Sequence, residues 1–119
     1  MPRYVILEHD YPERHWDFML EAGEVLRTWK LTSPPQVGLA IPAEKSFDHR
    51  CLYLDYEGPI SRGRGSVVRW DSGSFQTIAE ENDRLMVRLN GKVMNEDAIF
   101  ARDATGQWQV RFQKSGIES

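Results

Sequence analysis

The 119-residue chain lacks several features that define whole classes of protein. It has a single cysteine, Cys51, which excludes an intrachain disulfide framework and favours a reducing, cytoplasmic location. No apolar run reaches the length of about 18 residues that a membrane-spanning helix needs, and no secretory signal is present, so we expect no membrane association. The formal net charge of -3 gives no general attraction for nucleic acid, so a phosphate-binding surface requires a local cluster of basic residues.

Helical periodicity is scarce as well, and most segments alternate between apolar and polar residues, as β-strands do. Trp16, Phe18 and Leu20, for example, are predicted to face the core from one side of a strand. Strands are expected over 4–8, 15–21, 27–31, 51–56, 66–70, 74–78, 84–89, 92–101 and 107–114. The pattern predicts an all-β fold with little helix, a small closed or nearly closed β-barrel of about eight strands, because closure removes exposed sheet edges.

The connections between these strands are rich in glycine, proline and asparagine. A proline-rich loop is expected over 33–46 and a basic, glycine-rich loop over 58–65. Asn90-Gly91 is predicted to form a hairpin turn, because this dipeptide favours the backbone angles of two-residue turns. The length is that of one domain, so we expect a single monomeric domain over 1–119.

The first histidine-rich segment has the residue types of a divalent-metal site. His9 and His15 bracket the run H-D-Y-P-E-R-H, and Asp17 follows two residues later. His15 and Asp17 are expected on one strand face, roughly 6.5–7 Å apart at the backbone, and the short connection 10–14 can bring His9 beside them. Two imidazoles and a carboxylate suit Mn²⁺, Fe²⁺ or Zn²⁺. The alternative is a set of polar residues on the exposed face of an amphipathic strand.

The remaining histidine lies in the segment D-H-R-C-L-Y, where His49 and Tyr53 are predicted to share one face of a strand. Such a pair can donate to a phosphate oxygen or protonate a leaving group. The alternative is a structural histidine beside a packed tyrosine. Guanidinium groups that can bind phosphate, or can simply be solvated, are those of Arg50, Arg62 and Arg64.

These segments resemble, in the same order along the chain, the 3′-phosphoesterase module of bacterial DNA ligase D, which also occurs as a stand-alone protein. The motifs that carry the resemblance are E-H-D-Y-P-E-R-H-W-D-F-M-L-E at 8–21, V-L-R-T-W at 25–29, D-H-R-C-L-Y-L-D-Y-E-G at 48–58, G-S-V-V-R-W-D-S-G-S-F at 65–75 and L-N-G-K at 89–92. Several motifs in order over most of the chain make the resemblance specific.

The resemblance implies a small β-barrel enzyme that removes a terminal ribonucleoside or a 3′-phosphate from nucleic-acid 3′ ends, in DNA or DNA/RNA, during non-homologous end joining. It implies that His9, His15 and Asp17 bind the metal, typically Mn²⁺, with Zn²⁺ or another divalent ion as the alternative. It also implies that His49 contacts the scissile phosphate and that Tyr53 supports that site. A DNA ligase is the implied partner.

Three positions depart from the family pattern in ways that concern phosphate binding. The family usually has Arg at Met19, Gln at Leu7 and Lys near Ser33. The metal ligands are therefore kept while much of the phosphate clamp is not, and a reduced activity is expected, because one charged donor typically contributes about 2–4 kcal/mol to the transition state. Basic residues that could take over this contact are Lys30, Arg50 and Arg62.

Two other functions are open from the sequence. The first is a catalytically weak or inactive relative that binds nucleic-acid ends, or acts as a scaffold, and keeps the metal site. The second is a non-haem Fe²⁺ oxygenase, since His15, Asp17 and the downstream His49 have the composition of a two-histidine, one-carboxylate triad. Release of 3′-phosphate with Mn²⁺ separates the enzyme from the scaffold, and turnover of 2-oxoglutarate tests the oxygenase.

Overall fold

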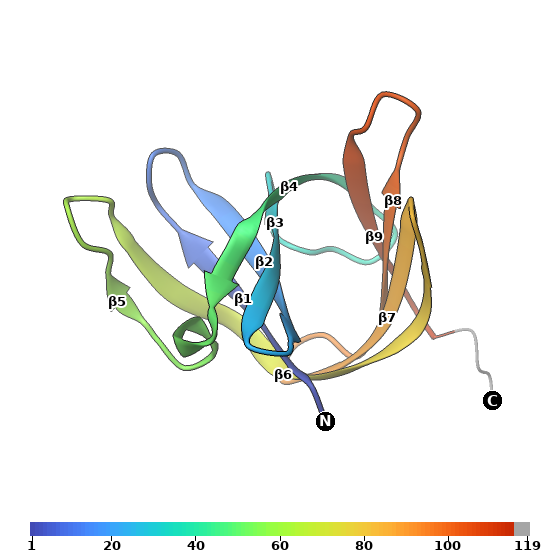
Figure 1. Ribbon diagram of the computed structural model, residues 1–119, viewed down its shortest axis with the longest axis horizontal. Helices are drawn as coiled ribbons and strands as arrows, with labels where there is room; N and C mark the ends of the chain where they lie inside the picture. The colour runs from blue at the N-terminus through green and yellow to red at the C-terminus, as the bar shows by residue number, and fades with distance from the viewer. Residues whose placement is uncertain (116–119) are drawn as a thin grey trace.

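The computed structural model describes residues 1–115, which form a closed antiparallel barrel of eight strands with one extra short strand (Figure 1). The last four residues of the domain expected over 1–119 lie outside this part. The elements are β1 (Arg3–His9), β2 (His15–Ala22), β3 (Val25–Leu31), β4 (Ala40–Arg50), the 3₁₀ turn η1 (Cys51–Leu54), β5 (Gly58–Pro59), β6 (Ser66–Glu81), β7 (Arg84–Gly91), β8 (Asp97–Arg102) and β9 (Trp108–Gln113). The barrel order β1-β2-β3-β4-β9-β8-β7-β6 is closed by pairing of β1 with β6. The expected all-β barrel is confirmed.

The interior of the barrel is filled by one set of alternating side chains. Phe18 packs against Phe100 and Phe112, with ring centroids 5.2 and 5.9 Å away. Trp16 borders this cluster, and Phe18 and Leu20 belong to it, as the alternation predicts. No helix of the described residues is long and apolar enough to cross a membrane.

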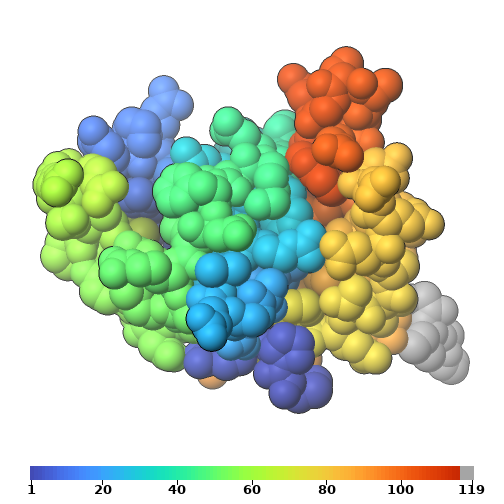
Figure 2. Space-filling model, viewed as in Figure 1, coloured from blue at the N-terminus to red at the C-terminus, as the bar shows by residue number. Residues whose placement is uncertain are grey.

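The opposite face of β1, β2 and β3 is also covered, by the segment that follows β4. A second apolar cluster there consists of Val5, Leu7, Met19, Leu26, Leu54 and Val67, with Cys51, Tyr53, Tyr56 and Ile60 packed against it. In the space-filling view, the green 40–60 segment forms the middle of the near face of the molecule (Figure 2). This part of the barrel wall is therefore buried on both sides, and polar residues on its outer face can be shielded from water.

Two expectations for the middle of the chain are wrong. Residues 40–46, expected within a loop, belong to β4, because Ile41 and Ala43 alternate with exposed neighbours and face the core despite the intervening proline. The strand expected over 51–56 is replaced by η1. Its buried residue Leu54 lies three positions after Cys51, the spacing that brings side chains onto one side of a 3₁₀ turn, and both pack on the second cluster.

The strands expected over 66–70 and 74–78 are one continuous strand, β6. The hairpin turn expected at Asn90-Gly91 is wrong as well, since both residues belong to β7 and pair with β6. The chain turns after Gly91, where the buried carboxylate of Asp71 accepts hydrogen bonds from the backbone of residues 93 and 94 and from the Tyr4 hydroxyl at 2.7 Å. A Cβ at Gly91 would meet that hydroxyl and that carboxylate, so glycine is required there by close packing rather than by the turn.

Candidate active site

The β1–β2 hairpin brings together the three predicted metal-binding residues. His9 and His15 are directly paired at the loop end of the hairpin, and Asp17 lies two residues along β2 on the same face. One ligand atom from each residue lies within 4.8 Å of those of the other two. Asp17 approaches both rings, at 3.2 Å from Nε2 of His15 and 3.7 Å from Nδ1 of His9. Among the described residues this is the group that could hold an ion, and His49 is not part of it.

Hydrogen bonds on the far side of each ring fix how the two imidazoles present their nitrogens. Nε2 of His9 lies 2.9 Å from the carbonyl oxygen of Arg64, and Nδ1 of His15 lies 2.9 Å from that of Glu13. A carbonyl accepts only, so these nitrogens carry the proton in the neutral rings. The lone pairs of His9 Nδ1 and His15 Nε2 are thereby left on the side of Asp17, which is the orientation that second hydrogen bonds impose on metal-bound histidines.

The atoms of His15 and Asp17 that face each other lack hydrogen-bond partners. Nε2 of His15 and Oδ1 of Asp17 are buried and make no hydrogen bond, although Asp17 is only 3% exposed. A proton on Nε2 would satisfy both atoms, so Asp17 raises the pKa of His15 above its usual value, with partial burial opposing this effect. A divalent ion would satisfy the same atoms. The donor set and its unsatisfied buried atoms thus fit a metal ion.

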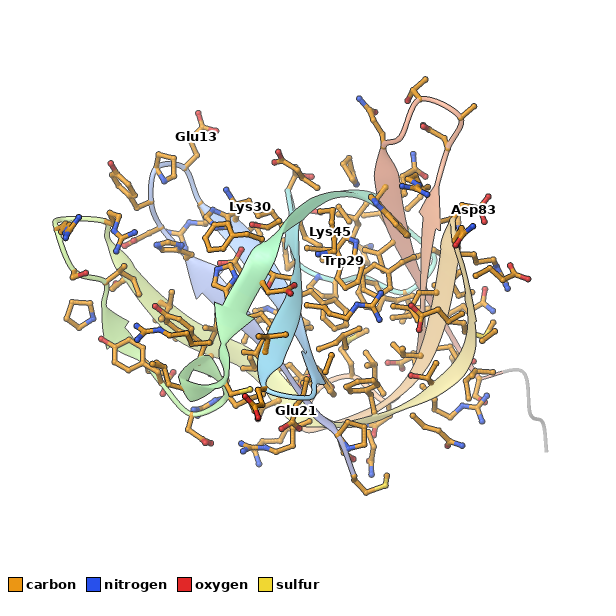
Figure 3. The ribbon with its side chains drawn as sticks, viewed as in Figure 1. Glu13, Glu21, Trp29, Lys30, Lys45 and Asp83 are labelled. Atoms are coloured by element: carbon orange, nitrogen blue, oxygen red, sulfur yellow. The ribbon has the colours of Figure 1, made fainter. Side chains whose placement is uncertain are left out.

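His49 lies on the same face of the sheet as the candidate metal site because β4 contains a β-bulge. Ser46 of β4 is paired with Thr28 and His49 with Leu26, so three steps along β4 match two along β3. The extra residue turns His49 to the side of the second cluster, as bulges commonly re-aim side chains. Before the bulge, Lys45 extends instead along the ring of Trp29 in the barrel interior, with its ammonium 5.1 Å from the ring centroid (Figure 3).

His49 is held by its neighbours on both sides. Nδ1 donates to the carbonyl oxygen of Phe47 at 3.0 Å, and the Phe47 ring stacks on the imidazole at 4.6 Å. The ring of Tyr53 in η1 meets the imidazole edge-on at 5.8 Å. The predicted pair of His49 and Tyr53 therefore comes together, through a strand end and a 3₁₀ turn rather than through one strand face.

A pocket of about 340 Å³ joins the candidate metal-binding residues to His49 and Tyr53. Arg50 and Arg64 line it, and Arg62 does not. The guanidinium of Arg64 also donates to the carbonyl and hydroxyl oxygens of Ser61. Lys30, the β3 partner of Asp17, lines the pocket as well and lies at the same end of the sheet as Glu13 of the β1–β2 loop (Figure 3).

Comparison with known proteins identifies the family. The sequence profile of the DNA ligase D 3′-phosphoesterase domain matches residues 7–102. The chain belongs to the DNA ligase D 3′-phosphoesterase domain family. It is 33% identical over 114 residues to the multifunctional non-homologous end joining DNA repair protein LigD of Mycobacterium tuberculosis, a match that covers 88% of this chain and 15% of the relative.

Two further LigD proteins show the same relationship. The Mycolicibacterium smegmatis protein is 34% identical over 131 residues, covering 94% of this chain and 17% of its own length. The Pseudomonas aeruginosa protein is 32% identical over 88 residues, covering 70% of this chain and 10% of its own. The chain therefore matches a small part of each of these curated relatives.

The positions that depart from the ligase D pattern have different surroundings. Leu7 and Met19 line the pocket and belong to the second apolar cluster, so the floor of the pocket is apolar where polar residues were expected from the family. Ser33 does not line the pocket. Of the basic residues considered as substitutes, Lys30 and Arg50 line it.

Phe47 and Tyr11 also line the pocket, and sequence reasoning did not single them out. Both are aromatic residues with large exposed areas beside polar site residues, at 74% and 43%. Their proximity in sequence to His49 and His9 was the available signal. The bulge that gives Phe47 its exposed position has no signature in the sequence.

Proposed function

We propose that this chain is a metal-dependent phosphoesterase that acts on the 3′ ends of nucleic acid, DNA or DNA/RNA, in the end-processing stage of DNA end joining. The observation that carries the proposal is the convergence of His9 Nδ1, His15 Nε2 and the buried Asp17 carboxylate beside His49 in one pocket. Family membership supports the reaction class. Removal of a 3′-phosphate or a terminal ribonucleoside, with a DNA ligase as partner in the pathway, is the specific form of this proposal.

His9, His15 and Asp17 would hold the ion, with Mn²⁺ proposed and Zn²⁺ or another divalent ion as alternatives. A divalent ion supplies Lewis-acid polarisation of a phosphoryl oxygen and lowers the pKa of bound water. The protein's own contribution is orientation: the carbonyl groups of Arg64 and Glu13 keep the two ring lone pairs directed at Asp17.

His49 is proposed to act on the phosphate. Its Nδ1 donates a hydrogen bond to the Phe47 carbonyl, so Nε2 is the ring nitrogen that is available to substrate. A protonated Nε2 can donate to a phosphoryl oxygen or to the leaving oxygen, and Tyr53 positions the ring by edge-on packing. Lys30, Arg50 and Arg64 are proposed to supply positive charge for substrate binding.

The test is release of phosphate from a 3′-phosphorylated primer–template with and without Mn²⁺. The wild type is expected to release phosphate only with the ion, and His15→Ala and His49→Ala are expected to lower the rate by at least about a hundredfold. Equal release by wild type and both variants would refute the proposal.

A second candidate is an end-binding or scaffold protein that keeps the ion but turns over slowly. The apolar floor made by Leu7 and Met19 favours it, because these side chains offer no donor to a phosphoryl oxygen. The phosphate-release assay, combined with measurements of ion binding and end binding, decides between the two. Binding of the ion and of nucleic-acid ends without release of phosphate supports the scaffold.

A further inference from the structure

Phe47 has a large apolar side chain that is 74% exposed, and the proposed hydrolysis does not use its ring. Single exposed apolar side chains are common and need no explanation by themselves. What distinguishes Phe47 is its fixed setting. It lies in the bulge of β4, lines the pocket beside the metal-binding residues, and stacks on His49 with the two ring planes only 9° from parallel.

One face of the Phe47 ring covers the imidazole of His49 at 4.6 Å, and the exposed fraction leaves the opposite face open. The backbone carbonyl of the same residue accepts the hydrogen bond from His49 Nδ1 at 3.0 Å. The ring and the carbonyl of Phe47 thus both contact the imidazole, and the two contacts favour this one orientation of the phenyl group. A flat, preoriented aromatic surface is suited to another flat group, because little conformational entropy is lost on stacking.

The charges around the pocket indicate which flat group fits. Three basic residues, Lys30, Arg50 and Arg64, and two carboxylates, Asp17 and Asp48, line it. Asp17 faces the two imidazoles and Asp48 lies 3.9 Å from Lys45, so the basic side chains are in excess and an anion is favoured next to the aromatic surface. A nucleotide combines both features, since its base is a flat ring and its phosphate is attached through one ribose. Because Phe47 and His49 are stacked, the open face of Phe47 lies on the side of its ring away from the imidazole that is proposed to contact the phosphate.

We propose that the open face of Phe47 stacks on the nucleobase of the terminal nucleotide. The site would then bind unpaired 3′ ends in preference to paired ones. This inference rests on the proposed function, because the phosphate of that nucleotide is taken to lie at His49 and the metal-binding residues. A base that stacks on protein must leave its place in a duplex, which is easiest in single strands and frayed ends. The stacking accepts any base, so the preference is for the presence of a base and not for its sequence.

The test is a comparison of two single-stranded oligonucleotides, identical except that one ends in a nucleoside and the other in an abasic sugar. Both are all-deoxyribose strands that end in a 3′-hydroxyl, so neither carries the 3′-phosphate or the terminal ribonucleoside that the proposed activity removes. Binding with Mn²⁺ is followed by the anisotropy of a 5′-fluorescein label. The wild type is expected to bind the base-bearing strand on the order of tenfold more tightly. Phe47→Ala is expected to bring this ratio close to one, and Phe47→Tyr, which keeps the ring, to preserve it.

Val93→Ala is the matched control, because Val93 is 55% exposed and lies outside the pocket lining. The inference is overturned by a ratio near one in the wild type, by an unchanged ratio in Phe47→Ala, or by equal weakening of both strands, which would mean that Phe47 acts only through His49. It is also overturned if Phe47→Ala abolishes self-association in sedimentation while the ratio stays unchanged, since Phe47 would then contact a second copy of the chain.

Failure of the proposed function has a different signature. A wild type that discriminates between the two strands but releases no phosphate from any 3′-phosphorylated end retains the stacking site without the hydrolysis. A wild type that releases phosphate equally from base-bearing and abasic ends, with no discrimination in binding, retains the hydrolysis without the stacking site.

Discussion

Asp17 and Met19 lie two residues apart on one face of β2, and the surface changes from polar to apolar between them. The Asp17 carboxylate faces two imidazoles, whereas Met19 is 1% exposed within the second apolar cluster. Both side chains line the same pocket. The pocket therefore has a polar end, with the candidate ligand atoms, and an apolar floor. Under the proposed function, a phosphate bound there would depend on charge from other strands.

Met19→Arg is expected to raise Mn²⁺-dependent release of 3′-phosphate by about tenfold or more, which corresponds to about 1.4 kcal/mol of transition-state stabilisation. Arginine supplies a charged fork to a phosphoryl oxygen, which a thioether cannot do. Because position 19 is buried, the variant is also expected to lose about 1–3 kcal/mol of stability. Initial rates on a 3′-phosphorylated primer–template and urea unfolding measure the two effects.

Met19→Leu keeps an apolar side chain of similar volume and serves as the control for packing. A wild type that is already fast, together with a slower Met19→Arg variant, would show that Lys30 or Arg50 holds the phosphate and that an added arginine competes with them.

His9→Ala, His15→Ala and Asp17→Ala are each expected to weaken Mn²⁺ binding by at least about tenfold, since each removes one of the converging ligand atoms. Isothermal titration calorimetry measures the affinity. His49→Ala is the control, because His49 lies outside this group and should keep the ion while losing phosphate release. An unweakened site in His15→Ala would contradict the ligand assignment.

Metal binding is expected to displace a proton from His15 at mildly acidic pH. The pKa of His15 is raised in the metal-free protein, chiefly by Asp17, so its stabilising effect is fully present below the unfolded value of 6.5 and is lost as the pH rises through the folded pKa. Metal affinity should change in the opposite direction and increase over the same range.

Urea unfolding in EDTA and Mn²⁺ titration, both between pH 5.5 and 8, follow the two trends. His15→Gln removes the titrating group and should flatten the contribution of this residue in both series. If Mn²⁺ binding releases the same number of protons from wild type and from His15→Gln, a group other than His15 causes the pH dependence of metal binding.

Gly65→Ala is expected to weaken metal binding several-fold without touching a ligand. The added Cβ would meet the Asp10 carboxylate, which accepts a hydrogen bond from the Ser66 backbone, and would lie 2.6 Å from Tyr11 Cβ. The 60–65 loop must shift to relieve these contacts, and its Arg64 carbonyl orients His9. Calorimetric titration with Mn²⁺ measures the loss.

Gly63→Ala is a matched control for backbone strain, because Gly63 and Gly65 have similar positive φ angles of 68° and 75° but a Cβ at Gly63 meets nothing within 4 Å. Equal weakening by both substitutions would show that left-handed backbone strain, and not the contact with Asp10, controls the loop.

Alternation along β2 was sufficient to predict which residues enter the barrel core and which three residues converge at the hairpin end. Both conclusions need only the two-residue period of a strand and one short connection. The position of His49 could not be derived in this way, because the register of β4 against β3 contains an extra residue that only the paired strands reveal.

The Asn90-Gly91 prediction failed for a related reason. The dipeptide has the local preferences of a hairpin turn, but Gly91 is needed where β7 passes over Tyr4 and Asp71, residues far away in sequence. Similarly, the prolines of 33–46 suggested a loop throughout, and burial of Ile41 and Ala43 in the barrel outweighs that local signal in the second half.

The two carbonyl groups that orient the histidines come from very different distances along the chain. Glu13 is two residues from His15, whereas Arg64 is 55 residues from His9 and lies two residues before β6, the strand that closes the barrel on β1. An isolated β1–β2 hairpin would thus contain all three ligands but only one oriented ring. The second orientation requires the pairing of β6 with β1, so an ion that needs both rings oriented would bind the closed barrel in preference to partly folded chains. Such an ion would stabilise the β1–β6 pairing by its binding free energy.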